Sequence, residues 1–144
     1  MGLDVGDRRI GIAVSDELGF TAQPLLTLVR GNKRNDVKSL ARILRKHNCV
    51  EIVVGDPLYM SGDLSPQAAK TQEFAQQLRD QFQIPVHLWD ERLTTTQAHR
   101  HLDDSGHAVL GRKKIIDQVA AVLILQSFLD ARSMKKDRDI AGEE

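Results

Sequence analysis

Residues 2–16 read GLDVGDRRIGIAVSD, and the rest of the chain is expected to be arranged around this segment. A turn signal at residues 6–8 separates two apolar runs, which predicts antiparallel strands at residues 3–7 and 9–15. Asp4 lies inside the first strand, where side-chain alternation sends its two apolar neighbours to the opposite face. A carboxylate buried in a sheet is costly unless something pairs with it. Asp4 therefore either caps the turn or binds a cation.

The rest of the chain alternates strands with helices. Serine followed by proline at residues 65–66 is a helix start signal, and a helical pattern continues to about residue 82. The run IIDQVAAVLILQSFL is the most hydrophobic in the chain and predicts a core helix over residues 113–130. The remaining expected elements are strands at 24–29, 50–55 and 85–89, a helix at 35–47 capped by Asn35, and a helix from Thr94 to about residue 104.

This order of elements predicts an α/β fold. Short turns make the three N-terminal strands antiparallel, whereas strands that follow helices need crossover connections and are parallel. We expect a five-stranded mixed sheet, with three antiparallel N-terminal strands and two parallel strands, flanked by helices. The 144 residues fit one domain, which we expect to span residues 1–131, followed by a polar, flexible tail at 132–144.

The composition is that of an ordinary globular protein, with 41% apolar and 28% charged residues. No apolar run approaches the roughly 20 residues that span a bilayer, so we expect no membrane partner and a cytoplasmic location. Lys and Arg number 20 and Asp and Glu number 20, so the overall charge attracts no polyanion. Basic residues nevertheless dominate residues 30–48, where Asp36 is the single acid. This run is either a solvated helix face or a surface for an anionic partner.

Three further acids stand out from the apolar pattern. Asp117 lies on the apolar stripe of the core helix, although a carboxylate there is also favoured by the helix dipole. Asp90 and Glu91 directly follow the fifth strand, where they could also be plain surface acids. Asp4, Glu91 and Asp117 together form an oxygen-rich set suited to Mg²⁺ or Mn²⁺. Two such ions can activate water and stabilise the leaving oxygen in phosphodiester cleavage.

Four ordered segments carry a resemblance to a known family: GLDVGDRRIGIAVSD, VVGDPLYMSG, WDERLTTTQA and IIDQVAAVLILQSFLD. They resemble the YqgF/RuvX family of Holliday junction resolvases, also described as nucleases that mature the precursor of 16S ribosomal RNA. The resemblance implies a ribonuclease H-like fold and a divalent-metal-dependent nuclease with two Mg²⁺ or Mn²⁺ ions. It implies that Asp4, Glu91 and Asp117 are the catalytic, metal-binding carboxylates, and that the partner is structured precursor RNA, cut at its 5′ end, or branched DNA.

Asp56 departs from the family pattern, which carries an apolar residue there. Because the fourth strand of such a sheet lies beside the first, Asp56 ends one strand spacing, about 4.8 Å, from the strand of Asp4. Asp56 is therefore a candidate extra or outer-shell carboxylate, as is Asp90, or else it is an aspartate in an ordinary turn before proline. Candidate phosphate contacts, which would offset repulsion between an acidic site and a polyanion, are Arg8, Arg9, Arg92, Lys113 and Lys114.

Two other functions fit parts of the pattern. A noncatalytic nucleic-acid-binding module would keep the fold and lose the chemistry, although all three expected acids are present. The Asp-x-Gly hairpin at residues 4–6 also resembles the first phosphate motif of the actin, chaperone and sugar-kinase group. That ATPase-like architecture needs a second lobe, for which 144 residues leave no room.

Overall fold

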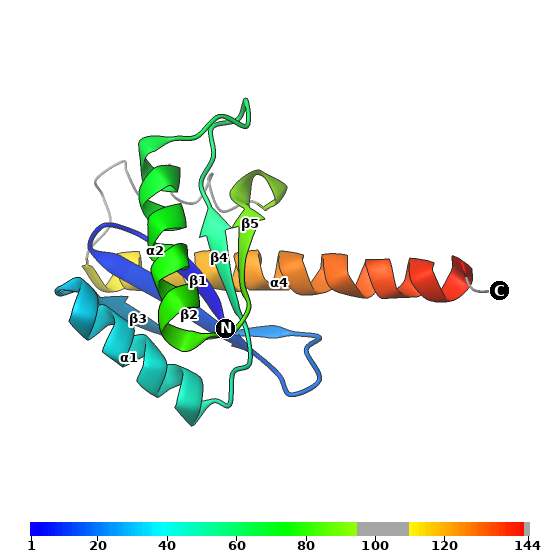
Figure 1. Ribbon diagram of the computed structural model, residues 1–144, viewed down its shortest axis with the longest axis horizontal. Helices are drawn as coiled ribbons and strands as arrows, with labels where there is room; N and C mark the ends of the chain where they lie inside the picture. The colour runs from blue at the N-terminus through cyan, green and yellow to red at the C-terminus, as the bar shows by residue number, and fades with distance from the viewer. Residues whose placement is uncertain (95–109, 143–144) are drawn as a thin grey trace.

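The computed structural model describes residues 1–94 and 110–142, with side chains for residues 1–94 and 114–140. Five strands form one sheet in the order β3-β2-β1-β4-β5 (Figure 1). The expected mixed sheet is confirmed, because β1–β2 and β2–β3 pair antiparallel whereas β1–β4 and β4–β5 pair parallel. The strands are β1 (Gly2–Val5), β2 (Arg9–Ser15), β3 (Ala22–Val29), β4 (Ile52–Asp56) and β5 (Val86–Asp90).

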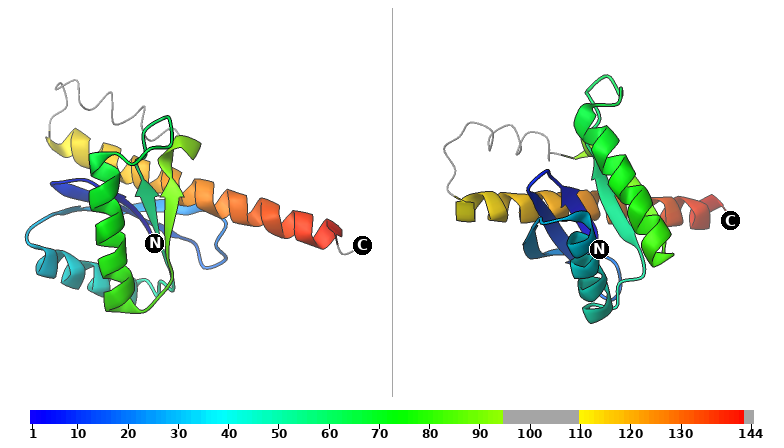
Figure 2. Two further views of the ribbon diagram at one scale, coloured as in Figure 1. Left: turned by 45° about the horizontal axis from the view of Figure 1, so that its top comes forward. Right: turned by 60° about the vertical axis from the view of Figure 1, so that its left-hand side comes forward.

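Helices cover both faces of this sheet. α1 (Lys33–Lys46) and α2 (Pro66–Phe82) pack on one face, and α4 (Leu110–Gly142) crosses the other (Figures 1 and 2). A single 3-10 turn, η1 (Glu91–Leu93), directly follows β5. The helix expected over residues 94–104 lies, apart from Thr94, outside the described residues. No described helix is long and apolar enough to cross a membrane.

Side-chain caps define where α1 and α2 begin. Ser65 caps α2 as expected, since its hydroxyl accepts a hydrogen bond from the Ala68 amide at 2.9 Å. The expected cap of α1 was wrong. Asn32, rather than Asn35, holds that position, and its side-chain oxygen accepts from the Asn35 amide at 2.8 Å. α1 therefore starts earlier than the apolar periodicity indicated.

The sheet separates two apolar layers, and alternation along each strand decides which residues enter which layer. The layer under α1 and α2 is the larger and includes Leu3, Ile10, Ile12, Leu40, Val54, Phe74 and Leu78. The layer under α4 is built from smaller residues on the sheet, with Ala13 and Val53 facing Ala121, Ile124 and Leu125. Small residues on this face let α4 approach the strands closely.

α4 is bound to the sheet along much of its length. Near its start, the Thr27 hydroxyl of β3 donates to the Lys114 carbonyl at 2.7 Å. Farther along, the Trp89 indole donates to the Ser127 hydroxyl at 3.0 Å, and Arg132 pairs with Glu51. Residues 132–142, for which we expected a flexible tail, are helical as far as the end of α4.

Gly11 marks the closest approach of α4 to the sheet. A Cβ atom at this position would lie 2.0 Å from the carbonyl oxygen of Asp117, which is backbone and cannot swing aside. Gly11 pairs with Asp4 on one side and with Thr27 on the other, so it lies in the middle of one row of residues across the sheet. Because Gly11 has no side chain, α4 can lie close to the row of residues that contains Asp4.

We expect Gly11→Ala to lower the free energy of unfolding by about 1 to 3 kcal/mol, because the added methyl group must push the helix backbone away. Gly31→Ala is the matched control, since a Cβ there meets no atom within 4 Å. Urea unfolding of the two variants measures the difference. Equal stabilities for the two variants would contradict the close approach.

Candidate active site

Asp4 lies at the centre of the site, on the face of the sheet that α4 covers. A Cβ at Gly2 would lie 2.7 Å from Leu125 of α4, so Gly2 faces that helix, and alternation puts Asp4 on the same face. Gly2 pairs with Val53 and Leu3 with Val54, so the same register, extended by one residue, puts Gly55 level with Asp4. Asp4, which is 4% exposed, thus stands between two glycines, Gly11 on β2 and Gly55 on β4.

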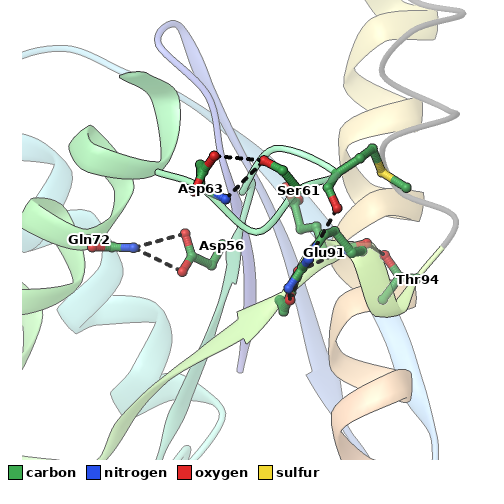
Figure 3. Close-up of polar contacts among 9 residues, drawn as sticks. Asp56, Ser61, Asp63, Gln72, Glu91 and Thr94 are labelled. Carbon is green, nitrogen blue, oxygen red and sulfur yellow. Dashed lines mark hydrogen bonds and ion pairs between the residues drawn. The ribbon is translucent and has the colours of Figure 1, made fainter. Parts of the chain in front are cut away.

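Glu91 fills the space that Gly55 leaves. It lies in η1, immediately after β5, and is fully buried (Figure 3). Its Oε1 atom lies 2.9 Å from where a Cβ of Gly55 would be. The amide and the hydroxyl of Thr94 both donate to the Glu91 carbonyl at 3.0 Å, which fixes the backbone of this turn. Glu91 is therefore directed back over β4 toward the strand of Asp4.

The environment of Glu91 disfavours its charge. Burial raises the pKa of this carboxyl to about 8, and the nearby carboxylates of Asp56 and Asp90 add to the effect. A bound cation would remove this penalty, because an opposite charge favours the ionised form. Strong perturbation of a buried acid is common at functional sites.

Asp117 approaches Asp4 from the other side. Its backbone lies against Gly11, the residue paired with Asp4, and its Oδ2 atom accepts a hydrogen bond from Arg9 Nε at 2.6 Å. Both side chains of this ion pair are largely shielded, 19% exposed for Arg9 and 17% for Asp117. Arg9 thus neutralises one of the three acids that the sequence nominated.

The fold gathers Asp4, Glu91 and Asp117 on one face, from β1, η1 and α4. Their donor atoms are all carboxylate oxygens, the ligands that Mg²⁺ and Mn²⁺ prefer, so the set fits such an ion in its chemistry. No three acids, histidines or cysteines among the described residues are already arranged as a metal-binding group. Asp117 is bound by Arg9 in this arrangement.

Asp56 points to the other face of the sheet. Gly55 faces α4, so alternation turns Asp56 toward α2, where the Gln72 amide donates to its two carboxylate oxygens at 3.1 and 3.4 Å (Figure 3). Burial raises the pKa of Asp56, and Asp90, its partner across the strands, raises it further. A role for Asp56 as an outer carboxylate remains a prediction. The structure connects Asp56 with the candidate site through its charge, which raises the pKa of Glu91.

The basic candidates lie in different surroundings. Arg92 forms an ion pair with Asp90 at 2.6 Å and donates to the Met60 carbonyl at 3.3 Å, so it braces the loop after β4. Arg8 is exposed in the turn that follows β1. Lys114 is partly exposed at the start of α4, and the side chain of Lys113 lies outside the described side chains.

Sequence reasoning missed the two glycines that shape the site. Gly11 and Gly55 each occupy a strand interior, where glycine is unfavourable unless another group approaches closely. That signal was present in the runs RRIGIAV and IVVGD. The two glycines mark where the α4 backbone and the Glu91 carboxylate contact the sheet.

Comparisons with known proteins agree with this architecture. A family model described as "RuvX: Holliday junction resolvase" matches residues 1–131. A protein of Koribacter versatilis with the name "Putative pre-16S rRNA nuclease" is 45% identical over 142 residues, covering 99% of this chain and 93% of its own. One of Moorella thermoacetica with the same name is 47% identical over 130 residues, covering 90% and 93%. Among solved structures, T. thermophilus RuvC in complex with a Holliday junction substrate matches with a TM-score of 0.52 at 17% identity. The match covers 92% of this chain and 93% of that one, and it shows that the two share a fold.

The raised pKa of Glu91 predicts how stability depends on pH. Between its ordinary value of 4.5 and about 8, the folded state keeps a proton that the unfolded chain has lost. The free energy of unfolding of the metal-free protein should therefore fall as pH rises from about 5 to about 8, by a few kcal/mol at most.

Glu91→Gln, which cannot ionise, should flatten this pH dependence, whereas Glu17→Gln, at an exposed position, should keep it. Urea unfolding in EDTA at several pH values gives the slopes. The same slope in Glu91→Gln as in the wild type is the result that contradicts the assignment.

Proposed function

Because this chain belongs to the RuvX family of Holliday junction resolvases, we propose that it is a divalent-metal-dependent nuclease in which Asp4, Glu91 and Asp117 hold the metal. The observation that carries the proposal is the pair of glycines beside Asp4. Gly11 admits the backbone of Asp117 and Gly55 admits the carboxylate of Glu91, which supports a site in which both residues share a cation with Asp4. Closely placed buried carboxylates repel one another, and a cation offsets that repulsion.

Each carboxylate comes from a different kind of element. Asp4 is held by the central strand, Glu91 by a turn fixed through Thr94, and Asp117 by a helix whose backbone lies against Gly11. When bound, Mg²⁺ or Mn²⁺, as two ions, would activate the attacking water and stabilise the leaving oxygen of a phosphodiester. The protein supplies ligands on rigid elements, which keeps the geometry needed for such chemistry.

Arg9 and Arg8 follow Asp4 in the chain and bring positive charge to the same end of the sheet. Arg9 is committed to Asp117, and we assign it the role of holding that carboxylate in place. Arg8 is exposed and available to a phosphate of the substrate. Such a contact orients the backbone without reading its sequence.

The substrate that we propose is the precursor of 16S ribosomal RNA, processed at its 5′ end. Relatives that carry the pre-16S rRNA nuclease name align with 90% or more of this chain at about 45% identity, which favours RNA. The family description favours a four-way DNA junction, and this is the second substrate to test.

The proposal predicts that the protein cuts a precursor RNA fragment in Mg²⁺ or Mn²⁺ and does not cut it in EDTA. Asp4→Asn should lower the cleavage rate at least about 100-fold, because a metal ligand is lost. Asp7→Asn is the matched control, since Asp7 lies in the adjacent turn, is exposed and pairs only loosely with Lys70, at 3.5 Å.

Both variants should keep the wild-type circular dichroism spectrum, and gel assays of the RNA and of a four-way junction give the rates and the substrate preference. The metal mechanism fails if neither substrate is cut or if Asp4→Asn cuts at the wild-type rate.

A further inference from the structure

α1 presents a strongly basic face that the catalytic site does not use. Its apolar side is buried, with Leu40 and Leu44 in the core, and its one acid, Asp36, is 2% exposed. Asp36 accepts hydrogen bonds from Arg30 at 3.1 Å and from the Gly31 amide at 3.0 Å, so its charge is turned inward and neutralised. The exposed side of α1 consequently carries only cations among its charged groups, namely Lys33, Arg34, Lys38, Arg42, Arg45 and Lys46.

Most of these cations have no acid to balance them. Lys33 lies 3.8 Å from Glu73, in a pair that is about two-thirds exposed on both sides. The other five form no ion pair with any described residue. The whole chain is formally neutral, with 20 basic and 20 acidic residues, so positive charge has been concentrated on this helix. We define the α1 stripe as Arg34, Lys38, Arg42 and Arg45, which lie within one quadrant of the helix at 100° per residue.

The α1 stripe starts at the end of the sheet where the catalytic carboxylates lie. Arg30 precedes α1 and ties it to the turn after β1, donating from its side chain to the Gly6 carbonyl at 2.8 Å and from its amide to the Arg8 carbonyl at 2.9 Å. The turn that carries the exposed Arg8 therefore contacts the residue that leads into α1. From there α1 extends for about 20 Å, at about 1.5 Å per residue.

A groove between α1 and α2 runs beside this stripe. It is lined by Lys33, Arg34, Val37, Lys38, Gln77 and Gln81. Amide and basic side chains are the groups that contact phosphate and sugar oxygens in nucleic-acid complexes. The exposed side of α1 lacks the large apolar residues with which an amphipathic helix enters a lipid surface, because those residues face the core.

We propose that the α1 stripe binds the phosphodiester backbone of the nucleic-acid substrate outside the cleavage site. This inference rests on the proposed nuclease function for the identity of the partner. Because Asp4 lies on the α4 face and α1 packs on the other face, a backbone that continues from the carboxylates to the stripe passes around the end of the sheet, past the exposed Arg8, to Arg34. Contacts of this kind recognise charge and spacing, so the stripe serves RNA and DNA alike and adds affinity without selecting sequence.

The test compares two triple variants that remove equal charge. Arg34→Gln, Lys38→Gln and Arg42→Gln together remove three of the four charges of the stripe, whereas Lys135→Gln, Lys136→Gln and Arg138→Gln remove three exposed charges near the end of α4. Binding is measured by fluorescence anisotropy in EDTA, with a labelled RNA hairpin and a labelled four-way DNA junction as probes. A salt titration gives the slope of log affinity against log salt.

We expect the stripe variant to bind both probes at least about tenfold more weakly, with a duplex slope shallower by up to about 2.7, since each phosphate contact contributes about 0.9. The α4 variant should bind like the wild type. Equal losses in the two variants, or no loss in the stripe variant, overturn the inference.

The outcome separates this inference from the nuclease assignment. A wild-type protein that cleaves, together with a stripe variant that binds normally, refutes the stripe alone. If the wild-type protein cleaves neither substrate and the stripe variant alone loses binding, the nuclease mechanism is refuted and the proposed role of the stripe in binding is supported.

Discussion

The contact of the α4 backbone with Gly11 is the constraint on which the site depends. A helix normally packs on a sheet through a layer of side chains, whereas here the Asp117 carbonyl occupies the place of a Gly11 side chain. This approach brings Asp117 to the row of residues that contains Asp4. Gly55 on β4 has the same role, because the side chains of Glu91 and Ile124 occupy the space that a side chain at Gly55 would need. The two glycines thus set both the packing of α4 and the positions of Asp117 and Glu91.

Electrostatics explains how so many acids coexist at one end of the sheet. Asp117 is bound by Arg9, Asp90 by Arg92, and Asp56 by the amide of Gln72. Glu91, buried between these groups, has a pKa raised to about 8. A desolvated carboxyl beside other acids is the kind of group whose charged form a bound cation would favour.

Much of this architecture follows from patterns in the sequence. Period-two alternation in β1 correctly separated Asp4 from Leu3 and Val5, and the capping serine before α2 was confirmed. The direction of the Asp56 side chain could not be predicted from the sequence pattern. The expected fourth strand ends at Gly55, whereas β4 includes Asp56. Because successive side chains in a strand point to opposite faces, Asp56 points away from the face of Gly55. The pairing of Arg9 with Asp117 joins residues 108 positions apart, which no local pattern reveals.

Anomalous diffraction from crystals of the full chain soaked in Mn²⁺ tests whether Asp4, Glu91 and Asp117 hold a metal ion. We expect an anomalous peak on the α4 face of the sheet, about 2.0 to 2.2 Å from carboxylate oxygens of Asp4 and Glu91, with Asp117 as a further ligand. A manganese ion bound elsewhere, or no peak at Asp4 under conditions in which the protein cleaves its substrate, would contradict it.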